Sequence, residues 1–121
     1  MPRRTKTPEG YVLDAVLDLL SVERIWHRRM NTGAHVVAAT ETTKRRFIKF
    51  GSKGMADVLA TPFLFSRKPV ILWIETKWKS KQREAQKEFQ AEVEEAGHYY
   101  LLARSTDDVI AWLKERKFKG V

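Results

Sequence analysis

The sequence predicts an α/β fold in which helices flank a mixed central sheet. The first indication is an uninterrupted apolar run, VILWI at 70–74, which is typical of a central strand covered on both faces. The second is that a helical pattern at 82–96 and another apolar strand at 98–103 follow this run. A strand–helix–strand unit implies a parallel pair with a right-handed crossover. The earlier strands are short and separated by turn residues, so we expect hairpins to link them within the same sheet.

The other elements are predicted in chain order from capping residues and periodicity. Thr7 suits a helix N-cap, Pro8 the first helical position and Glu9 the positive end of the helix dipole, and apolar residues at helical spacing continue to about residue 20. Apolar segments between turn residues then predict strands at 25–30, 35–40, 45–50 and 56–65. Gly97 is the expected C-cap of the 82–96 helix, and Ser105 or Thr106 caps a last helix.

Composition limits the class of protein. A chain of 121 residues with 43% hydrophobic content suits one domain, with a core at about 8–114 and basic segments at both ends. The chain has no apolar run long enough for a membrane span and no signal-like N-terminal segment, so we expect a cytoplasmic protein with no membrane contact. Because there is no cysteine, oxygen or imidazole must hold any metal. The net charge of +8 favours a polyanionic partner.

Charged residues at the end of the strongest strand need an explanation. Glu75 and Lys77 are two residues apart and therefore share one face of the strand. Burying such a pair is costly, so a purely structural role is a weak explanation, although the strand could simply end at Glu75 with solvated charges. Asp57 opens the preceding strand, and a turn at 66–69 brings it near Glu75. Two carboxylates beside a lysine suit Mg²⁺ or Mn²⁺ and phosphodiester hydrolysis.

These residues resemble a known nuclease family. GMAD at 54–57 followed by IETK at 74–77 resembles the PD-(D/E)XK nuclease signature, with Ala56 where that family has proline. The segments TPEGYVLDAVLDLL, RMNTGA, RFIKFGSKGMAD, WIETK and QREAQKEFQAEVEEAGHYYLLARSTDDV together resemble the VRR-NUC (virus-type replication-repair nuclease) domain over about 8–114. The resemblance implies a PD-(D/E)XK nuclease-like mixed central sheet flanked by helices.

The resemblance also implies a role for each matched residue. The expected metal ligands, for Mg²⁺ or Mn²⁺, are Asp57, Glu75, Glu9 and the Thr76 carbonyl. Lys77 would orient or help to deprotonate the attacking water, and Gln86 would brace the site or touch the phosphate. The expected DNA contacts are Arg29, Asn31, Lys53, Lys79 and Lys81. Of the tryptophans we expect Trp26, Trp73 and Trp112 in the core, whereas Trp78 follows the site directly and could stack on a base.

The expected function is that of a metal-dependent, structure-selective DNA endonuclease. The resemblance implies a homodimer that cuts branched DNA such as four-way (Holliday) junctions during DNA replication or repair, in a phage or prophage setting within a bacterial host cell. One alternative is a nuclease with another structure preference, such as flap trimming or duplex nicking. A second alternative is a non-catalytic DNA-binding module on the same fold.

Overall fold

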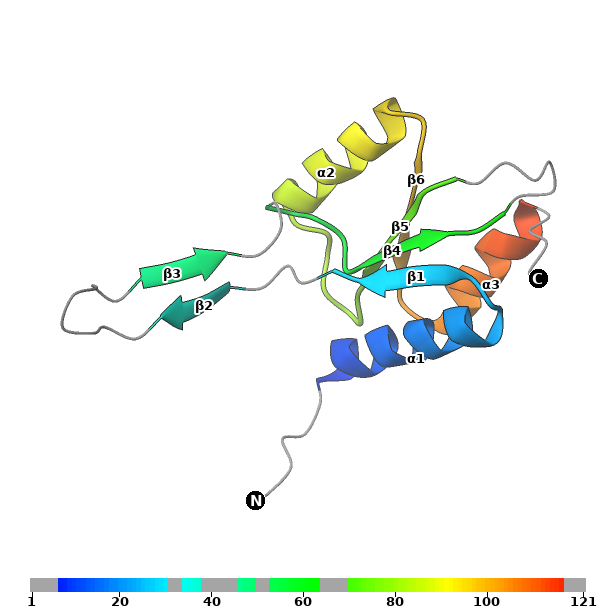
Figure 1. Cartoon of the computed structure of the whole chain (residues 1–121), viewed down its shortest axis with the longest axis horizontal. Coiled ribbons are helices and arrows are strands. Elements are labelled where there is room, and N and C mark those ends of the chain that lie inside the picture. Colours follow the sequence, from blue (N-terminus) through cyan, green and yellow to red (C-terminus); the bar gives the residue numbers. More distant parts are fainter. Residues whose placement is uncertain (1–6, 31–33, 38–45, 50–52, 64–69, 117–121) are drawn as a thin grey trace, which may run out of the picture.

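The computed structural model describes residues 7–30, 34–37, 46–49, 53–63 and 70–116, which form a mixed α/β fold with three helices and six strands (Figure 1). In chain order the elements are α1 (Pro8–Val22), β1 (Trp26–Arg29), β2 (Ala34–Val37), β3 (Arg46–Lys49), β4 (Val58–Thr61), β5 (Leu72–Thr76), α2 (Glu84–Glu95), β6 (Tyr99–Ala103) and α3 (Thr106–Glu115). Every predicted element is present. The strands predicted at 25–30 and 98–103 extend one residue beyond each end of β1 and one residue before β6, and residues 38–40, 45, 50 and 64–65 of the other predicted strands lie outside the described residues.

Four strands make the main sheet, in the order β1-β4-β5-β6. β4 pairs antiparallel with both β1 and β5, whereas β5 and β6 are parallel and are connected through α2. The predicted strand–helix–strand unit is therefore confirmed. The expectation that all earlier strands join this sheet was wrong, because β2 and β3 pair with each other as a separate two-stranded sheet. Figure 1 shows this ribbon extending to one side of the main sheet.

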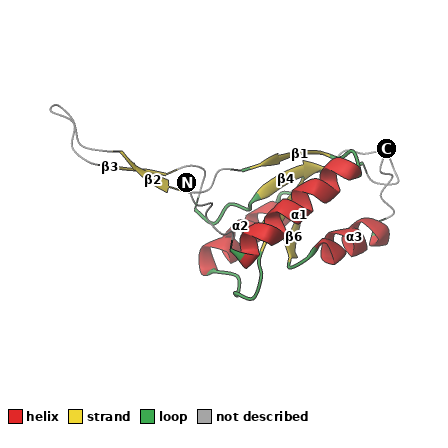
Figure 2. Ribbon diagram, turned by 90° about the horizontal axis from the view of Figure 1, so that it is seen from below, coloured by secondary structure: helices red, strands yellow, loops and turns green. Residues whose placement is uncertain are grey.

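The two faces of the main sheet are covered by different helices. α1 and α3 pack side by side under one face, and α2 lies over the other (Figures 1 and 2). Strand residues at alternate positions, including Val58, Leu72 and Ile74, are fully buried in the core formed with α1 and α3. On the opposite face, Trp73 packs edge-to-face against Phe89 of α2, with the ring centroids 5.0 Å apart.

The helix ends follow the predicted capping chemistry with one exception. Thr7 Oγ1 accepts a hydrogen bond from the Gly10 amide at 3.0 Å, which fixes the start of α1. Gly97, with φ +86°, lies just beyond α2, and the His98 amide donates back to the Val93 carbonyl at 3.0 Å. Ser105 is the N-cap of α3, but its side chain makes no capping hydrogen bond.

Of the three tryptophans expected in the core, only one is buried. Trp112 is buried and Trp73 is half-buried, but Trp26 is 53% exposed because it lies on the edge strand β1. Trp78, which the sequence set apart from the others, is 48% exposed. Among the described helices, none has the length and apolar character needed to cross a membrane.

Candidate functional site

The sheet register brings Asp57 opposite Glu75. Val58 pairs with Ile74 at the end of the antiparallel β4–β5 ladder, and one further step along each strand leads to Asp57 and Glu75. Asp57 Oδ2 accepts hydrogen bonds from both the amide and the hydroxyl of Thr76, each at 2.9 Å. The backbone of Asp57 is also held, since the Met30 amide donates to its carbonyl at 2.7 Å. Asp57 is thus fixed between the ends of β1 and β5.

Glu75 and Lys77 are both buried, each with 3% exposure. Lys77 Nζ lies 3.9 Å from Glu75 Oε1, and Gln86 Nε2 from α2 donates to the same oxygen at 2.8 Å. The other carboxylate oxygen, Glu75 Oε2, is buried and has no hydrogen-bond partner among the described residues. Buried polar atoms are nearly always paired, so an unpaired carboxylate oxygen points to an additional ligand.

A third carboxylate comes from the opposite face of the sheet. Glu9 lies in the first turn of α1, and one of its oxygens falls within 4.8 Å of a carboxylate oxygen from Asp57 and one from Glu75. Glu9 and Asp57 are half-buried and Glu75 is buried. The acidic cluster, as we call Glu9, Asp57 and Glu75, therefore joins α1 to two neighbouring strands of the sheet.

The electrostatics of the cluster favour a bound cation. The pKa of Glu75 is raised to about 8, first by burial and next by the negative charge of Asp57; the charge of Lys77 opposes this shift, and the charge of Glu9 adds a smaller increase. Mutual repulsion of this kind is relieved when a cation sits between the carboxylates. Carboxylate oxygens are the ligands that Mg²⁺ prefers, and Mn²⁺ accepts the same donors. The donor set and the unpaired oxygen of Glu75 both fit such an ion.

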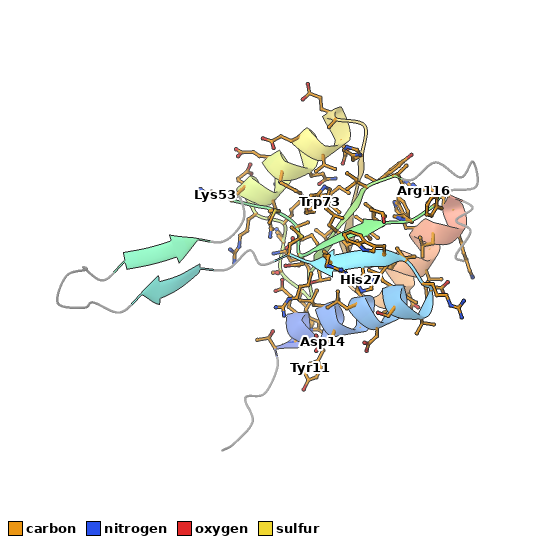
Figure 3. All side chains as sticks on the ribbon, viewed as in Figure 1. Tyr11, Asp14, His27, Lys53, Trp73 and Arg116 are labelled. Carbon is orange, nitrogen blue, oxygen red and sulfur yellow. The ribbon has the colours of Figure 1, made fainter. Side chains whose placement is uncertain are left out.

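A close backbone approach holds α2 against the site. Gly54 has φ +79°, and a Cβ atom added there would stand 2.1 Å from the Ala85 carbonyl oxygen. The turn before Asp57 therefore touches the first turn of α2, next to Gln86. Figure 3 shows Lys53, the residue before this glycine, beside the start of α2. The sequence gave no sign of this contact, because it joins residues about thirty positions apart.

The structure brings together the residues predicted to be catalytic or to hold a metal, which are Glu9, Asp57, Glu75, Thr76, Lys77 and Gln86. Thr76 contributes its amide and hydroxyl to Asp57, a contact that the sequence did not predict. Arg29 is exposed at the end of β1, where it pairs with Val58 and so lies beside Asp57.

The remaining predicted DNA contacts lie around the same end of the sheet. Lys53 is exposed in the turn before Asp57, and Lys79 and Lys81 are exposed in the segment after β5. Asn31 lies outside the described residues. The sequence also missed Arg104, whose Nη1 donates to the carbonyls of Trp78 and Ser80 at 3.2 and 3.0 Å. No local pattern connects residues so far apart in the chain.

Comparisons of the chain with models of protein families, with curated proteins and with solved structures give no match. The residues and geometry of the acidic cluster are therefore the main indication of function.

Proposed function

We propose that the protein is a Mg²⁺- or Mn²⁺-dependent DNA endonuclease with a VRR-NUC domain of the PD-(D/E)XK nuclease type. The observation that carries this proposal is the convergence of Glu9, Asp57 and Glu75 beside the buried Lys77. The mixed sheet with its helices on both faces is consistent with the proposed fold. Non-catalytic DNA binding would not require a carboxylate and an ammonium to be buried side by side, because desolvating them is costly.

The acidic cluster would hold the divalent ion through carboxylate oxygens, with the Thr76 carbonyl as a further ligand suggested by the family resemblance. Such an ion would supply Lewis-acid chemistry by polarising a phosphoryl oxygen and lowering the pKa of the attacking water. The hydrogen bonds from Thr76 to Asp57 and from Gln86 to Glu75 keep the two carboxylates in place before DNA arrives. A preorganised site needs little rearrangement during the reaction.

Lys77 has a separate role from the carboxylates. Its ammonium lies 3.9 Å from Glu75 Oε1 and is fixed by burial, so it can donate a hydrogen bond to the attacking water or to the scissile phosphate. During hydrolysis the water oxygen bonds to phosphorus as the bond to the leaving oxygen breaks. The leaving oxygen takes up a proton and the attacking water gives one up. The positive charge of Lys77 stabilises the negative charge that grows on the phosphoryl group.

Binding of DNA would come mainly from surface charge. The chain carries a net charge of +8, and the exposed side chains of Arg29, Lys53, Lys79 and Lys81 lie around the sheet end that carries the acidic cluster. Contacts of this kind bind the phosphate backbone without reading sequence, and salt weakens them. A substrate recognised by its shape, as branched DNA is, suits this surface.

A homodimer acting on four-way junctions is our preferred form of the activity. Two sites related by a two-fold axis can cut two strands of like polarity symmetrically. The structure offers an apolar surface away from the acidic cluster, since Trp26 and Phe63 are 53% and 52% exposed and Trp26 pairs with Thr61 at the far end of the β1–β4 ladder. Sedimentation at the concentrations used for cleavage tests the dimer, and a monomer that makes paired cuts would refute it.

The function is tested by incubating the protein with Mg²⁺ or Mn²⁺ and labelled duplex, nicked, flap, fork and four-way-junction DNAs. We expect cleavage of branched DNA, with paired cuts in the four-way junction. Preferred cleavage of flaps or nicked duplex would support a nuclease with another structure preference. If the protein binds these DNAs but cleaves none of them, the enzyme function is rejected and a non-catalytic DNA-binding module is the remaining alternative.

A further inference from the structure

An apolar groove lies beside the acidic cluster, between the start of α1 and the segments that follow β5 and β6. Its volume is about 420 Å³, within the range of small-molecule sites. One wall is a stripe on α1, with residues at positions i, i+3, i+4 and i+7, and the other carries an aromatic ring and a guanidinium. These lining residues are Pro8, Tyr11, Val12 and Ala15 on α1, and Trp78 and Arg104 opposite them.

Each wall of the groove contains a residue that is adjacent in the chain to a residue of the proposed catalytic site. On α1, Glu9 of the acidic cluster stands between Pro8 and Tyr11. On the other wall, Trp78 follows the buried Lys77. Adjacent Cα atoms are about 3.8 Å apart, so Pro8 lies next to Glu9 of the cluster, and Trp78 lies next to Lys77 and three residues beyond Glu75. A molecule whose phosphate lies at the cluster would place its neighbouring groups at the groove.

The aromatic rings of the groove are exposed without an obvious structural reason. Tyr11 is 56% exposed and Trp78 is 48% exposed, and in Figure 3 Tyr11 projects from α1 away from the body of the protein. The Trp78 segment is nevertheless held in place, because Arg104 Nη1 donates to the carbonyls of Trp78 and Ser80. Holding the segment in advance reduces the entropy lost when a ligand packs on the ring.

The surroundings of the groove are cationic, which favours a ligand that combines a flat apolar part with negative charge. Lys79 Nζ lies 5.8 Å from the centroid of the Trp78 ring, and Arg104 lines the groove itself. A nucleotide has this combination: its base stacks on aromatic rings, and its phosphate pairs with lysine or arginine. A base inside a duplex is already stacked and cannot enter such a groove unless it is flipped out.

We propose that this groove binds an unpaired nucleobase of the DNA, adjacent to the phosphate at the acidic cluster, and so selects branched substrates with exposed bases. The inference rests on the proposed nuclease function for its choice of ligand. Stacking on Trp78 and Tyr11 supplies affinity that paired DNA cannot use, since stacking contributes about 1–3 kcal/mol per base. Selection of branched DNA then needs no base-specific hydrogen bonds.

The test is a binding measurement that does not depend on cleavage. Two matched DNAs, a fork with unpaired bases at the branch and a continuous duplex, are bound in EDTA, with 2-aminopurine at the branch of the fork as a stacking probe. We expect Trp78→Ala to weaken fork binding about tenfold, to leave duplex binding within about twofold and to abolish quenching of 2-aminopurine. Tyr11→Ala should act in the same direction, whereas Trp78→Phe, which keeps a ring, should restore most of the quenching.

Lys79→Ala is the matched control, because removing a neighbouring charge should weaken fork and duplex binding equally. Equal binding of the fork by wild type and Trp78→Ala, equal loss on both DNAs, or quenching that survives in the Trp78→Ala variant would each overturn the inference. If the protein shows Trp78-dependent quenching but cuts no DNA, base binding in the groove is supported and the nuclease function is rejected. If the Trp78→Ala variant cleaves branched DNA at the wild-type rate, the nuclease function is supported and substrate selection by the groove is rejected.

Discussion

Gln86 donates a hydrogen bond to Oε1 of Glu75 at 2.8 Å, and this contact determines which oxygen of the carboxylate remains free. The amide of Gln86 is itself oriented, because the Arg83 backbone N–H at the start of α2 donates to its oxygen at 2.8 Å. Glu75 Oε2 has no partner among the described residues. The start of α2 therefore positions the Glu75 carboxylate through one side chain.

Replacing Gln86 should impair cleavage without unfolding the protein. Gln86→Ala removes a hydrogen bond to a charged group, an interaction worth about 1.5–3 kcal/mol, so we expect the cleavage rate to fall about tenfold or more. Gln86→Glu should be more damaging, since it places a fourth carboxylate against the acidic cluster. Gln90→Ala is the control, because Gln90 contacts Gln82 and Glu94 instead of the site. A Gln86→Ala protein with the wild-type rate would contradict this role.

Gly54 should tolerate a side chain less well than Gly97. Both have positive φ, so alanine costs about 1–2 kcal/mol of backbone strain at either position. At Gly54 the new Cβ would also meet the Ala85 carbonyl, whereas at Gly97 nothing lies within 4 Å. Urea unfolding should show a clearly larger loss of stability for Gly54→Ala, and the folded fraction of that variant should cleave slowly because α2 is displaced. Equal losses for the two variants would mean that the contact with α2 is unimportant.

The raised pKa of Glu75 predicts how stability changes with pH in the absence of divalent cations. The pKa is about 8 in the folded protein, against an ordinary value of 4.5 expected in the unfolded chain. Between these values the folded state binds a proton that the unfolded state has lost, so the free energy of unfolding should fall as pH rises through this window and level off above it. Urea unfolding in EDTA at about pH 5 and about pH 9 measures the change.

Glu75→Gln supplies the comparison for the pH experiment, because glutamine has a similar shape and does not titrate. The variant should lose less stability than wild type between the two pH values. Added Mg²⁺ should stabilise wild type more at the higher pH, where the ion does not have to displace the Glu75 proton. The same pH dependence in both proteins would show that Glu75 titrates normally.

Different divalent ions should separate binding from catalysis. Mg²⁺ and Mn²⁺ should support cleavage, and Ca²⁺ should raise the unfolding temperature without supporting it, because its larger and looser coordination sphere misplaces the attacking water. Asp57→Asn should reduce the thermal shift given by all three ions. Full activity in excess EDTA would exclude the proposed chemistry.

The main parts of the fold and site could be predicted because they depend on local patterns. Periodicity and capping located α1 and α2, and the turn predicted at 66–69 placed Asp57 near Glu75, in agreement with the register of β4 and β5. The separate pairing of β2 with β3 was missed, since alternation identifies a strand but does not specify its partner.

Contacts between distant segments account for the rest of what the sequence did not predict. The exposure of Trp26 follows from the edge position of β1, which depends on strand order. The packing of Gly54 on Ala85 and the hold of Arg104 on the Trp78 segment both join residues that are close only after folding. Periodicity and residue spacing carry no signal for such pairs.

The most direct test of the acidic cluster as the catalytic site is the rate of Mg²⁺-dependent cleavage of a four-way junction. This rate is measured, together with junction binding, for wild type and for the Asp57→Ala, Glu75→Ala and Lys77→Ala variants. Each substitution should abolish cleavage, because it removes either a proposed metal ligand or the charge proposed to stabilise the transition state. Binding should persist, since it depends mainly on the basic surface. A folded Glu75→Ala protein that cuts the junction at the wild-type rate would contradict the assignment of the acidic cluster as the catalytic site.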